Sequence, residues 1–420
     1  MKIAVVGGGS TYTPELADGI AGLAGTLAVE ELVLVDPDAE RVAVVGGVSA
    51  RILAERGHGT RVSWTGDLDA AVDGAGAVLL QLRVGGQAAR HGDESWPQEC
   101  GCIGQETTGA GGLAKALRTV PVVLDIAERV RKRALPDAWI VDFTNPVGIV
   151  TRALLDQGHR AVGLCNVAIG FQRRFARTLG VAPERVSLDH IGLNHLTWER
   201  EVRLDGVDAL PEVLDRSGDE LADRVGLPLD VLRRLGVVPS YYLRYFYRHD
   251  TVLAEQRDSP TRAEEVTLLE KELLENYADQ NWQYNAELLG KRGGAFYSDA
   301  ALRLVSSLRG DIGDVQVLNV RNNGTMPFLP DDTVIEVPAR VDASGAVAEP
   351  IRPVEPLFAG LIAHVAAYEE LAVAAALHGG RERVYDALLA HPLVGQVELA
   401  HGLADRLLAR NAEHLPWASV

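Results

Sequence analysis

The sequence predicts an α/β protein whose N-terminal half is a doubly wound parallel sheet, and three observations support this prediction. Strand and helix signals alternate through residues 1–190, an order that produces a parallel sheet. The first apolar run breaks into three glycines, and the second ends in an aspartate. After residue 190 the alternation gives way to mixed signals, so we expect a C-terminal α+β domain packed intimately on the first. The two predicted domains span residues 1–190 and 191–420.

The first strand–turn–helix unit has the features of a dinucleotide site. Lys2–Val6 is a mainly apolar run rich in β-branched residues, typical of a strand buried on both faces. The glycines after it allow a tight turn and close approach of the backbone to a pyrophosphate at the next helix N-terminus. Tyr12 stands where a third glycine is usual, so an ordinary glycine-rich turn is the alternative. The second run, Glu31–Val35, ends in Asp36, which suits the hydroxyls of an adenosine ribose and favours NAD over NADP. The predicted cofactor-binding residues are Gly7, Gly9, Ser10, Thr11 and Asp36.

The remaining elements follow from the apolar pattern along the chain. In the first half we expect strands at 61–64, 77–82, 138–143 and 160–164, with a helix at 113–134. In the second half we expect strands at 186–190 and 196–204, helices at 211–236, 239–249 and 261–289, β structure at 314–339 and a helical tail at 355–411.

The bulk composition excludes several classes of partner. The 420 residues carry a net charge of −17, which argues against nucleic acid or an anionic membrane. We expect that no stretch reaches the length of a membrane span, and the first residues lead into a strand rather than a signal peptide. Three cysteines cannot form a complete disulfide framework, so a reducing cytoplasm is the expected location. Cys100 and Cys102 lie in a glycine-rich loop without a second pair, and we expect no zinc site there.

Several polar residues follow predicted strands, where a parallel sheet delivers its ligands. Asn145 follows one strand and Cys165-Asn166 the next, while His195 lies in the segment IGLNHLTW. A thiolate, an imidazole and open positions can hold a divalent transition metal, and two protein ligands leave room for substrate hydroxyls. The alternatives are a plain turn for Asn145, a small core residue for Cys165 and a structural histidine for His195.

A cluster of tyrosines supplies a candidate base. Tyr241 and Tyr242 lie in the segment YYLRY, and a tyrosine acts as a base only where a cation or a partner favours loss of its proton. The alternative is an aromatic helix face in the core. Arg90 and Arg262 are candidates to anchor an anion, although either alone is also a plausible surface charge. Glu106 lies in the polar loop QETTG, where it either begins a helix or partners a buried acid–base group.

Taken together, these residues resemble glycoside hydrolase family 4, whose members depend on NAD and a metal and lack the usual carboxylate pair. The resemblance spans nearly the whole chain. Within the family, Cys-Asn resembles the 6-phospho-β-glucosidase branch, which usually continues Val-Pro or Ile-Pro where this chain has Val167-Ala168. The motifs that carry it are GGGSTYTPEL, GQETTGAGG, DFTNP, GLCN, GLNHLTW, YYLRYFY and KRGGAFYS.

The resemblance implies a lactate/malate dehydrogenase-like fold and a role for each residue. Cys165 and His195 would bind Mn²⁺, and Tyr242 would remove the C2 proton, with Tyr241 the competing assignment. Glu106 would raise the basicity of that tyrosine. The implied substrate-binding residues are Arg90, Asn145, Asn166 and Arg262, the last near the sugar phosphate.

The reaction implied by the resemblance is hydrolysis of a 6-phospho-β-glucoside through C3 oxidation, C2 deprotonation, elimination, water addition and re-reduction. A homodimer or homotetramer is also implied. An α-linked or unphosphorylated sugar is the alternative within the family. Outside it, the alternatives are an NAD-dependent 2-hydroxy-acid dehydrogenase, with His195 as acid–base group and Arg90 as carboxylate clamp, and a non-catalytic NADH-sensing or sugar-binding regulator.

Overall fold

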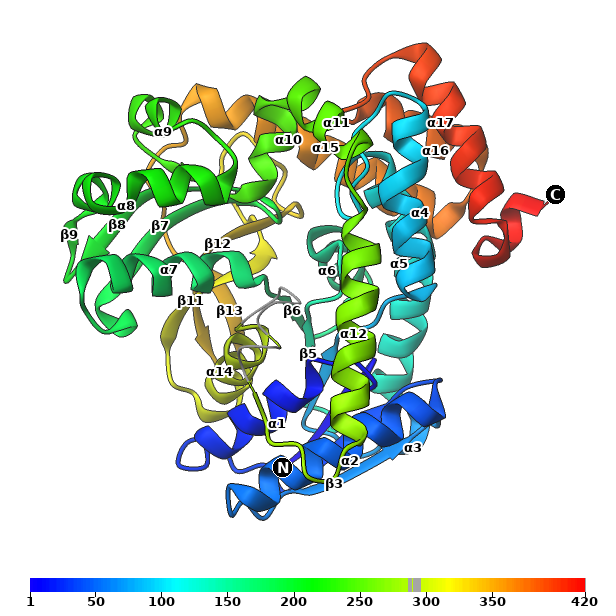
Figure 1. Ribbon diagram of the computed structural model, residues 1–420, viewed down its shortest axis with the longest axis vertical. Helices are drawn as coiled ribbons and strands as arrows, with labels where there is room; N and C mark the ends of the chain where they lie inside the picture. The colour runs from blue at the N-terminus through cyan, green and yellow to red at the C-terminus, as the bar shows by residue number, and fades with distance from the viewer. Residues whose placement is uncertain (286–288, 290–295, 420) are drawn as a thin grey trace.

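The computed structural model describes residues 1–285, 289 and 296–419, and a nine-stranded mixed sheet runs through it (Figure 1). Its parallel part has the order β3-β2-β1-β4-β5-β6, which is the order of a Rossmann-type sheet. The remaining strands, β11, β12 and β13, continue it in antiparallel fashion from β6. The strands are β1 Lys2–Val6, β2 Glu31–Val35, β3 Arg61–Thr65, β4 Ala77–Leu80, β5 Trp139–Asp142, β6 Ala161–Gly163, β11 Asp314–Arg321, β12 Val334–Asp342 and β13 Gly345–Ala348.

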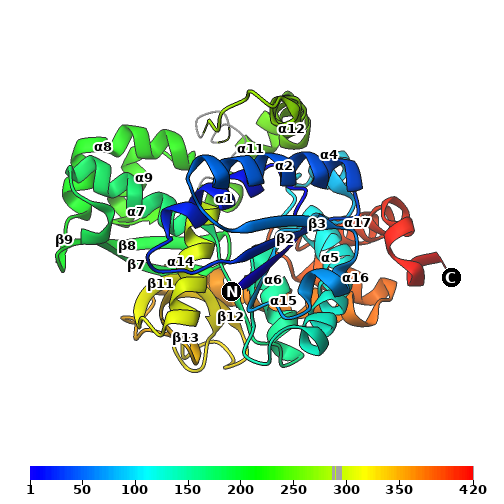
Figure 2. The same cartoon turned by 90° about the horizontal axis from the view of Figure 1, so that it is seen from below.

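Helices cover both faces of this sheet, which explains the nearly continuous apolar runs of its central strands. In β1 the last four residues are buried, as are all four in β4 and β5. Figure 2 shows α1 and α2 on one face and α5 and α6 on the other. The helices of this half are α1 Thr13–Gly22, α2 Ala39–Glu55, α3 Leu68–Val72, α4 Gly86–Glu99, α5 Gly109–Arg133 and α6 Val147–Asp156.

A small antiparallel sheet forms the core of the second half. Its central hairpin, β7 Val186–Leu193 and β8 Leu196–Leu204, packs through β7 against β12 of the large sheet. Two short strands, β9 Val207–Asp208 and β10 Val238–Pro239, both pair with β8. Around it lie α7 Asn166–Leu179, the 3-10 turn η1 Pro183–Arg185, α8 Leu210–Val225 and α9 Leu229–Leu235.

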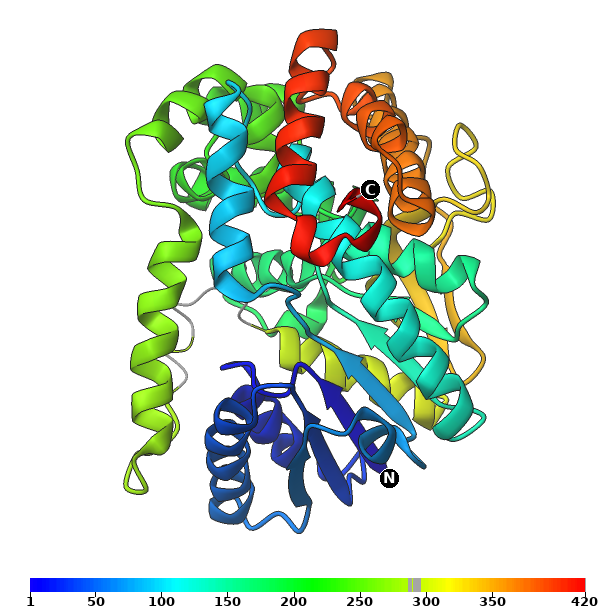
Figure 3. The same ribbon diagram turned by 90° about the vertical axis from the view of Figure 1, so that its right-hand side faces the viewer.

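The segment after β10 leads back over the N-terminal half. It contains η2 Tyr241–Leu243, α10 Arg244–Tyr247, α11 His249–Arg257 and the long α12 Arg262–Ala278, which runs beside α4 and α2 (Figure 3). A capping box between Thr261 and Glu264 begins α12. Near its other end, Arg51 of α2 donates from Nη2 to the carbonyl oxygen of Tyr277 at 2.8 Å. This helix therefore bridges the two halves.

The C-terminal third completes the shell of helices. Its elements are α14 Tyr297–Gly310, α15 Pro356–His378, α16 Arg381–Ala390, α17 Val397–Arg410, η3 Ala412–His414 and η4 Pro416–Ser419. The helix α15 is long and apolar enough to cross a membrane, with a mean hydropathy of 1.4 over its best window. The expectation that no stretch reaches a membrane span is therefore wrong for α15. In the fold this helix packs against α5, α6 and α16, and 44% of that window is buried.

Most predicted elements form, and several predicted helices are divided. The helix expected at 211–236 breaks into α8 and α9 because Gly226 adopts a left-handed φ of 68° ahead of Pro228. The segment 239–249 is not one helix but begins with strand β10 and the 3-10 turn η2, followed by α10 and the start of α11. The helix expected at 261–289 ends at Ala278, and residues 286–288 lie outside the described residues. The tail at 355–411 forms three helices. The predicted ranges do not include α2, α4, α6, α7 or α14.

Candidate active site

The glycine turn after β1 folds over the carboxyl ends of β2 and β4. Gly7 has a φ of +82°, and its amide, like that of Gly8, donates to the carbonyl oxygen of Val35 at 3.0 Å. At Gly9 a Cβ atom would lie 2.9 Å from Asp36 Oδ2, the atom to which the Gly9 amide donates at 3.0 Å. The turn therefore needs glycine to hold Asp36 close to the start of α1.

A cavity of about 330 Å³ opens over this turn. Gly7, Gly9, Ser10 and Asp36 line it, together with Tyr12. Thr11, expected with them, is fully buried and does not line this cavity. Backbone amides at a helix N-terminus beside an acidic residue at a strand end suit the pyrophosphate and ribose of a dinucleotide.

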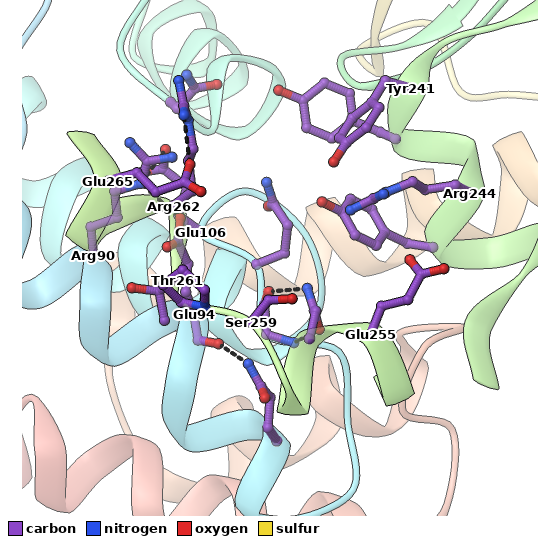
Figure 4. A pocket seen from close by; sticks show the side chains of 18 of the residues that line it. Arg90, Glu94, Glu106, Tyr241, Arg244, Glu255, Ser259, Thr261, Arg262 and Glu265 are labelled. Carbon is purple, nitrogen blue, oxygen red and sulfur yellow. Dashed lines mark hydrogen bonds and ion pairs between the residues drawn. The ribbon is translucent and has the colours of Figure 1, made fainter. Parts of the chain in front are cut away.

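A larger cavity of about 590 Å³ adjoins the first. Both are lined by Tyr12, Arg83, Asn145 and Tyr297, so one opens into the other. Figure 4 shows Arg90, Glu106 and Arg262 on one side of the larger cavity, facing Tyr241 and Arg244 on the other. The predicted residues that line it are Arg90, Glu106, Asn145, Asn166, Tyr242 and Arg262. Six positions spread over more than 170 residues of sequence thus meet around one space.

Cys165 and His195 lie behind the wall of this cavity. Cys165 follows β6, and His195 occupies the turn between β7 and β8 with a φ of 64°. The ring of His195 stacks on that of Tyr242, with centroids 3.7 Å apart and planes 10° apart. Cys165 has an aromatic neighbour of its own: the hydroxyl of Tyr297 donates a hydrogen bond to Cys165 Sγ at 4.0 Å.

Burial keeps both of these groups uncharged. It raises the pKa of the Cys165 thiol to about 12 and lowers the pKa of His195 to about 4. A neutral imidazole has a lone pair for a cation, and a bound cation lowers the pKa of a coordinating thiol. Within residues 1–285, 289 and 296–419, no group of three or more His, Cys, Asp or Glu side chains is arranged to hold a metal. The donor set thus fits a two-ligand catalytic ion and not a closed structural site.

A buried network supports the hairpin that carries His195. Asn194 donates from Nδ2 to Glu336 Oε2 at 3.0 Å. His190 lies between two carboxylates, with Nδ1 2.7 Å from Glu199 Oε1 and Nε2 3.1 Å from Glu336 Oε1. Burial alone would lower the pKa of His190, but these two carboxylates outweigh it and raise the pKa to about 10. A protonated histidine therefore joins β7, β8 and β12 beneath the site.

Glu106 is surrounded by cations. Lys115 Nζ lies 2.5 Å from Glu106 Oε2, Arg90 Nε lies 3.1 Å from Oε1, and Arg83 is a third partner. Burial by itself would raise the pKa of Glu106, but the three cations hold it well below the usual range. Arg90 is also held by Glu94 at 2.7 Å. The carboxylate therefore stays ionised and fixes the basic side of the cavity.

The two adjacent tyrosines occupy different places. Tyr242 stacks on His195, whereas Tyr241 is 39% exposed and has the Arg244 guanidinium 4.2 Å above its ring. Burial is the main cause that raises the pKa of Tyr242 well above its usual value, Glu106 adds to the increase, and Arg90 opposes it. Of these two tyrosines, Tyr242 is therefore the one that stands beside a candidate metal ligand.

Asn145 and Arg262 offer groups for a ligand. The Oδ1 atom of Asn145 is buried without a hydrogen-bond partner in the described part of the chain, so it can accept a hydrogen bond from a bound molecule. Arg262 is the first residue of α12, and its Nη1 lies 2.6 Å from Glu265 Oε2. It also lines the larger cavity.

Comparison with known proteins identifies the family. Residues 2–181 match the family described as Family 4 glycosyl hydrolase, and residues 190–394 match its C-terminal domain. The chain belongs to glycosyl hydrolase family 4. It is therefore a glycoside hydrolase.

Individual relatives of this family 4 enzyme cover almost the whole chain. It is 38% identical to a probable 6-phospho-β-glucosidase from Bacillus subtilis, over 99% of this chain and 97% of the relative. A crystal structure of the 6-phospho-β-glucosidase from Thermotoga maritima with manganese, NAD⁺ and glucose-6-phosphate has a TM-score of 0.91 and 34% identity, over 99% of both chains. Malate dehydrogenase from Plasmodium falciparum, at 13% identity and a TM-score of 0.55, covers 92% of this chain and all of its own. This last similarity confirms the predicted dehydrogenase-like fold.

Sequence reasoning missed several residues of the family 4 enzyme's cavities. Arg83 follows β4, so its position at a strand end was a usable signal. Tyr12 departs from the glycine pattern of the turn, and it lines both cavities. Lys115 gave no local signal, because it lies inside α5 among apolar residues and meets Glu106 only in the folded chain.

Proposed function

We propose that this family 4 enzyme hydrolyses 6-phospho-β-glucosides and uses bound NAD and a divalent cation such as Mn²⁺. The observation that carries the proposal is the junction of the two cavities. A dinucleotide on the glycine turn would extend toward Tyr12, Asn145 and Tyr297, the residues that also border the cavity of Tyr242. The phosphoglucosidase relatives from two bacteria, both named as β enzymes, support this choice of substrate.

The residues fit both groups that the reaction needs. Gly7, Gly9 and Asp36 would hold the dinucleotide, and Cys165 with His195 would hold the cation. When bound, the dinucleotide supplies a hydride acceptor and the cation supplies a Lewis acid for the neighbouring sugar oxygens.

Tyr242 is the residue we assign to proton transfer. As the phenolate, its oxygen takes the proton from C2 of the sugar once C3 has become a ketone, and the bond from C1 to the aglycone then breaks. Arg90 favours the phenolate because its charge opposes the effect of burial on the pKa of Tyr242. Asn145 orients the sugar through its Oδ1 atom, which has no hydrogen-bond partner among the described residues. After water has added at C1, Tyr242 returns the proton to C2.

Local arginines supply the affinity for the phosphate group. The chain has a net charge of −17, so its overall field repels an anion. Arg90 and Arg262 line the substrate cavity, and a guanidinium binds a phosphate through paired, charge-assisted hydrogen bonds. Arg262 is the first residue of α12 and lines this cavity, and we assign it to the sugar phosphate.

The test uses p-nitrophenyl β-glucoside 6-phosphate with NAD⁺, Mn²⁺ and a reductant. The unphosphorylated substrate, the α-linked phosphorylated isomer and reactions lacking each cofactor run in parallel. We expect nitrophenol release only from the phosphorylated β-glucoside and only with both cofactors. Turnover of the unphosphorylated or α-linked substrate would contradict the substrate assignment, and full turnover without NAD⁺ or metal would contradict the mechanism. Light scattering on the same sample measures whether the enzyme is the homodimer or homotetramer that we also infer.

A further inference from the structure

His195 makes a directed side-chain hydrogen bond at the site, and it does so through Nδ1. This atom lies 2.9 Å from the hydroxyl oxygen of Thr107, in the loop between α4 and α5. The residue is 5% exposed, and the Tyr242 ring stacks on one face of its imidazole. A neutral imidazole has two tautomers, and only one of them leaves Nε2 with a lone pair. The direction of the bond to Thr107 therefore decides whether Nε2 can bind a cation.

The Gln105 side chain determines that direction. Its Oε1 atom faces the backbone amides of Thr107 and Thr108, the second at 3.2 Å. Two N–H donors require an acceptor, so the atom they meet is the carbonyl oxygen of the amide and not its nitrogen. The Thr107 hydroxyl oxygen lies 2.7 Å from the same Oε1. Because a carbonyl oxygen has no hydrogen, the Thr107 hydroxyl must donate its only proton to Gln105.

Thr107 can then meet His195 only as an acceptor. We propose that Gln105 and Thr107 set the tautomer of His195, with the proton on Nδ1 and the lone pair on Nε2, and so act as positioning residues for the divalent cation. The inference rests on the proposed function only in its last step, the binding of the cation at Nε2. Residues that orient a histidine ligand in this way are typically worth 10- to 100-fold in metal affinity.

The first test reads the tautomer directly in the full-length, metal-free protein. Two-bond ¹H–¹⁵N correlation spectra of the ¹⁵N-histidine-labelled protein distinguish the two tautomers, and a His195→Gln variant assigns the signals. We expect His195 to carry its proton on Nδ1 without metal, NAD or substrate. A wild-type spectrum with the proton on Nε2 would overturn the proposal, and this outcome needs no variant to fold.

Variants separate the hydroxyl from the shape of the loop. Thr107→Val removes the acceptor with little change in volume, and Gln105→Leu frees the Thr107 hydroxyl to donate to His195. Both are expected to move His195 toward the tautomer protonated on Nε2 and to weaken Mn²⁺ binding, followed by electron paramagnetic resonance, by about 10- to 100-fold. Thr107→Ser keeps the hydroxyl, so we expect it to retain the wild-type tautomer of His195 and the wild-type affinity for Mn²⁺. Thr108→Val is the matched control, because that hydroxyl faces His391 and not His195.

The tautomer of His195 and the binding of Mn²⁺ test different parts of the argument, and either can contradict its part alone. If the variants leave the tautomer of His195 unchanged, another group sets it and the proposal is wrong. If the tautomer changes as expected while the wild type binds no Mn²⁺, the roles of Gln105 and Thr107 in setting the tautomer stand and the metal assignment in the proposed function falls.

Discussion

Replacing Glu106 by glutamine tests whether one buried carboxylate holds the basic side of the substrate cavity together. The substitution keeps the shape of the side chain and removes the negative charge that Arg83, Arg90 and Lys115 share. These cations differ in their access to water: the Lys115 side chain is 3% exposed, that of Arg90 13% and that of Arg83 26%. Lys115 is therefore the cation whose charge is least stabilised by water once Glu106 is neutral.

The expected cost follows from this arrangement. Removing one partner of a buried ion pair costs about 3–5 kcal/mol. Arg90 keeps Glu94 at 2.7 Å, and Arg83 is partly solvated, so we expect the low end, about 3 kcal/mol at about pH 6. Burial, followed by Arg83, lowers the pKa of Lys115 to about 7 from an ordinary value of 10.5, although Glu106 opposes the shift.

The pKa of Lys115 determines how the destabilisation caused by Glu106→Gln changes with pH. Between pH 7 and 10.5 the unfolded chain binds the lysine proton and the folded protein does not, so this residue makes folding more favourable as the pH rises through that range. In the wild type, Lys115 and Glu106 form an ion pair below about pH 7. Above that pH the lysine is a neutral amine, and only a hydrogen bond joins the two side chains. The cost of Glu106→Gln should therefore fall to about 1–2 kcal/mol at about pH 8.5.

Urea unfolding at one fixed protein concentration, at about pH 6 and about pH 8.5, measures both values. The control is Glu99→Gln, which breaks an ion pair with Arg406 whose two side chains are 47% and 46% exposed. An exposed pair of this kind contributes about 0–1 kcal/mol. A cost for Glu106→Gln no larger than that of the control at the lower pH, or a cost that grows with pH, would refute the reasoning.

Three further predictions concern the cofactor, the base and the network beneath the site. Tyr242→Phe should lower kcat for the phosphorylated nitrophenyl glucoside by about 10²- to 10⁴-fold, whereas Tyr241→Phe should change it by less than about tenfold; comparable losses would contradict the assignment of the base. Asp36→Ala should raise the Kd for NAD⁺ by about 10- to 100-fold, measured by calorimetry, because it removes a charged hydrogen-bond acceptor for the ribose; an unchanged Kd would exclude that contact. The raised pKa of His190 stabilises the fold fully below pH 6.5, and this contribution is lost as the pH rises through about 10. His190→Gln should therefore be less stable than the wild type at neutral pH, with a smaller difference in urea unfolding above about pH 10; a difference that does not shrink would show that its charge is not the cause.

Local spacing was enough to predict the parts of the site that follow strands. The glycine turn and Asp36 come at the ends of β1 and β2, and Asn145 and Cys165 at the ends of β5 and β6. Parallel strands deliver their carboxyl ends to one edge of a sheet, so a correct list of strands already places these residues together. The same reasoning could not find the limits of α8 and α9 or the path after β10, because tertiary packing and not propensity decides those breaks.

What the sequence by itself determined is therefore the sheet, the nucleotide turn and the residue types of a family 4 site. The tertiary structure alone decided which tyrosine stands against His195, since Tyr241 and Tyr242 are neighbours in sequence and differ only in the direction that η2 gives them. It also decided that Lys115 and Arg83 meet Glu106, and that Thr107 meets His195 across 88 residues of chain. Such contacts depend on how α5, the loop before it and the β7–β8 hairpin pack in space. The hydrophobic pattern along the chain does not determine which of these side chains come within hydrogen-bond distance of one another.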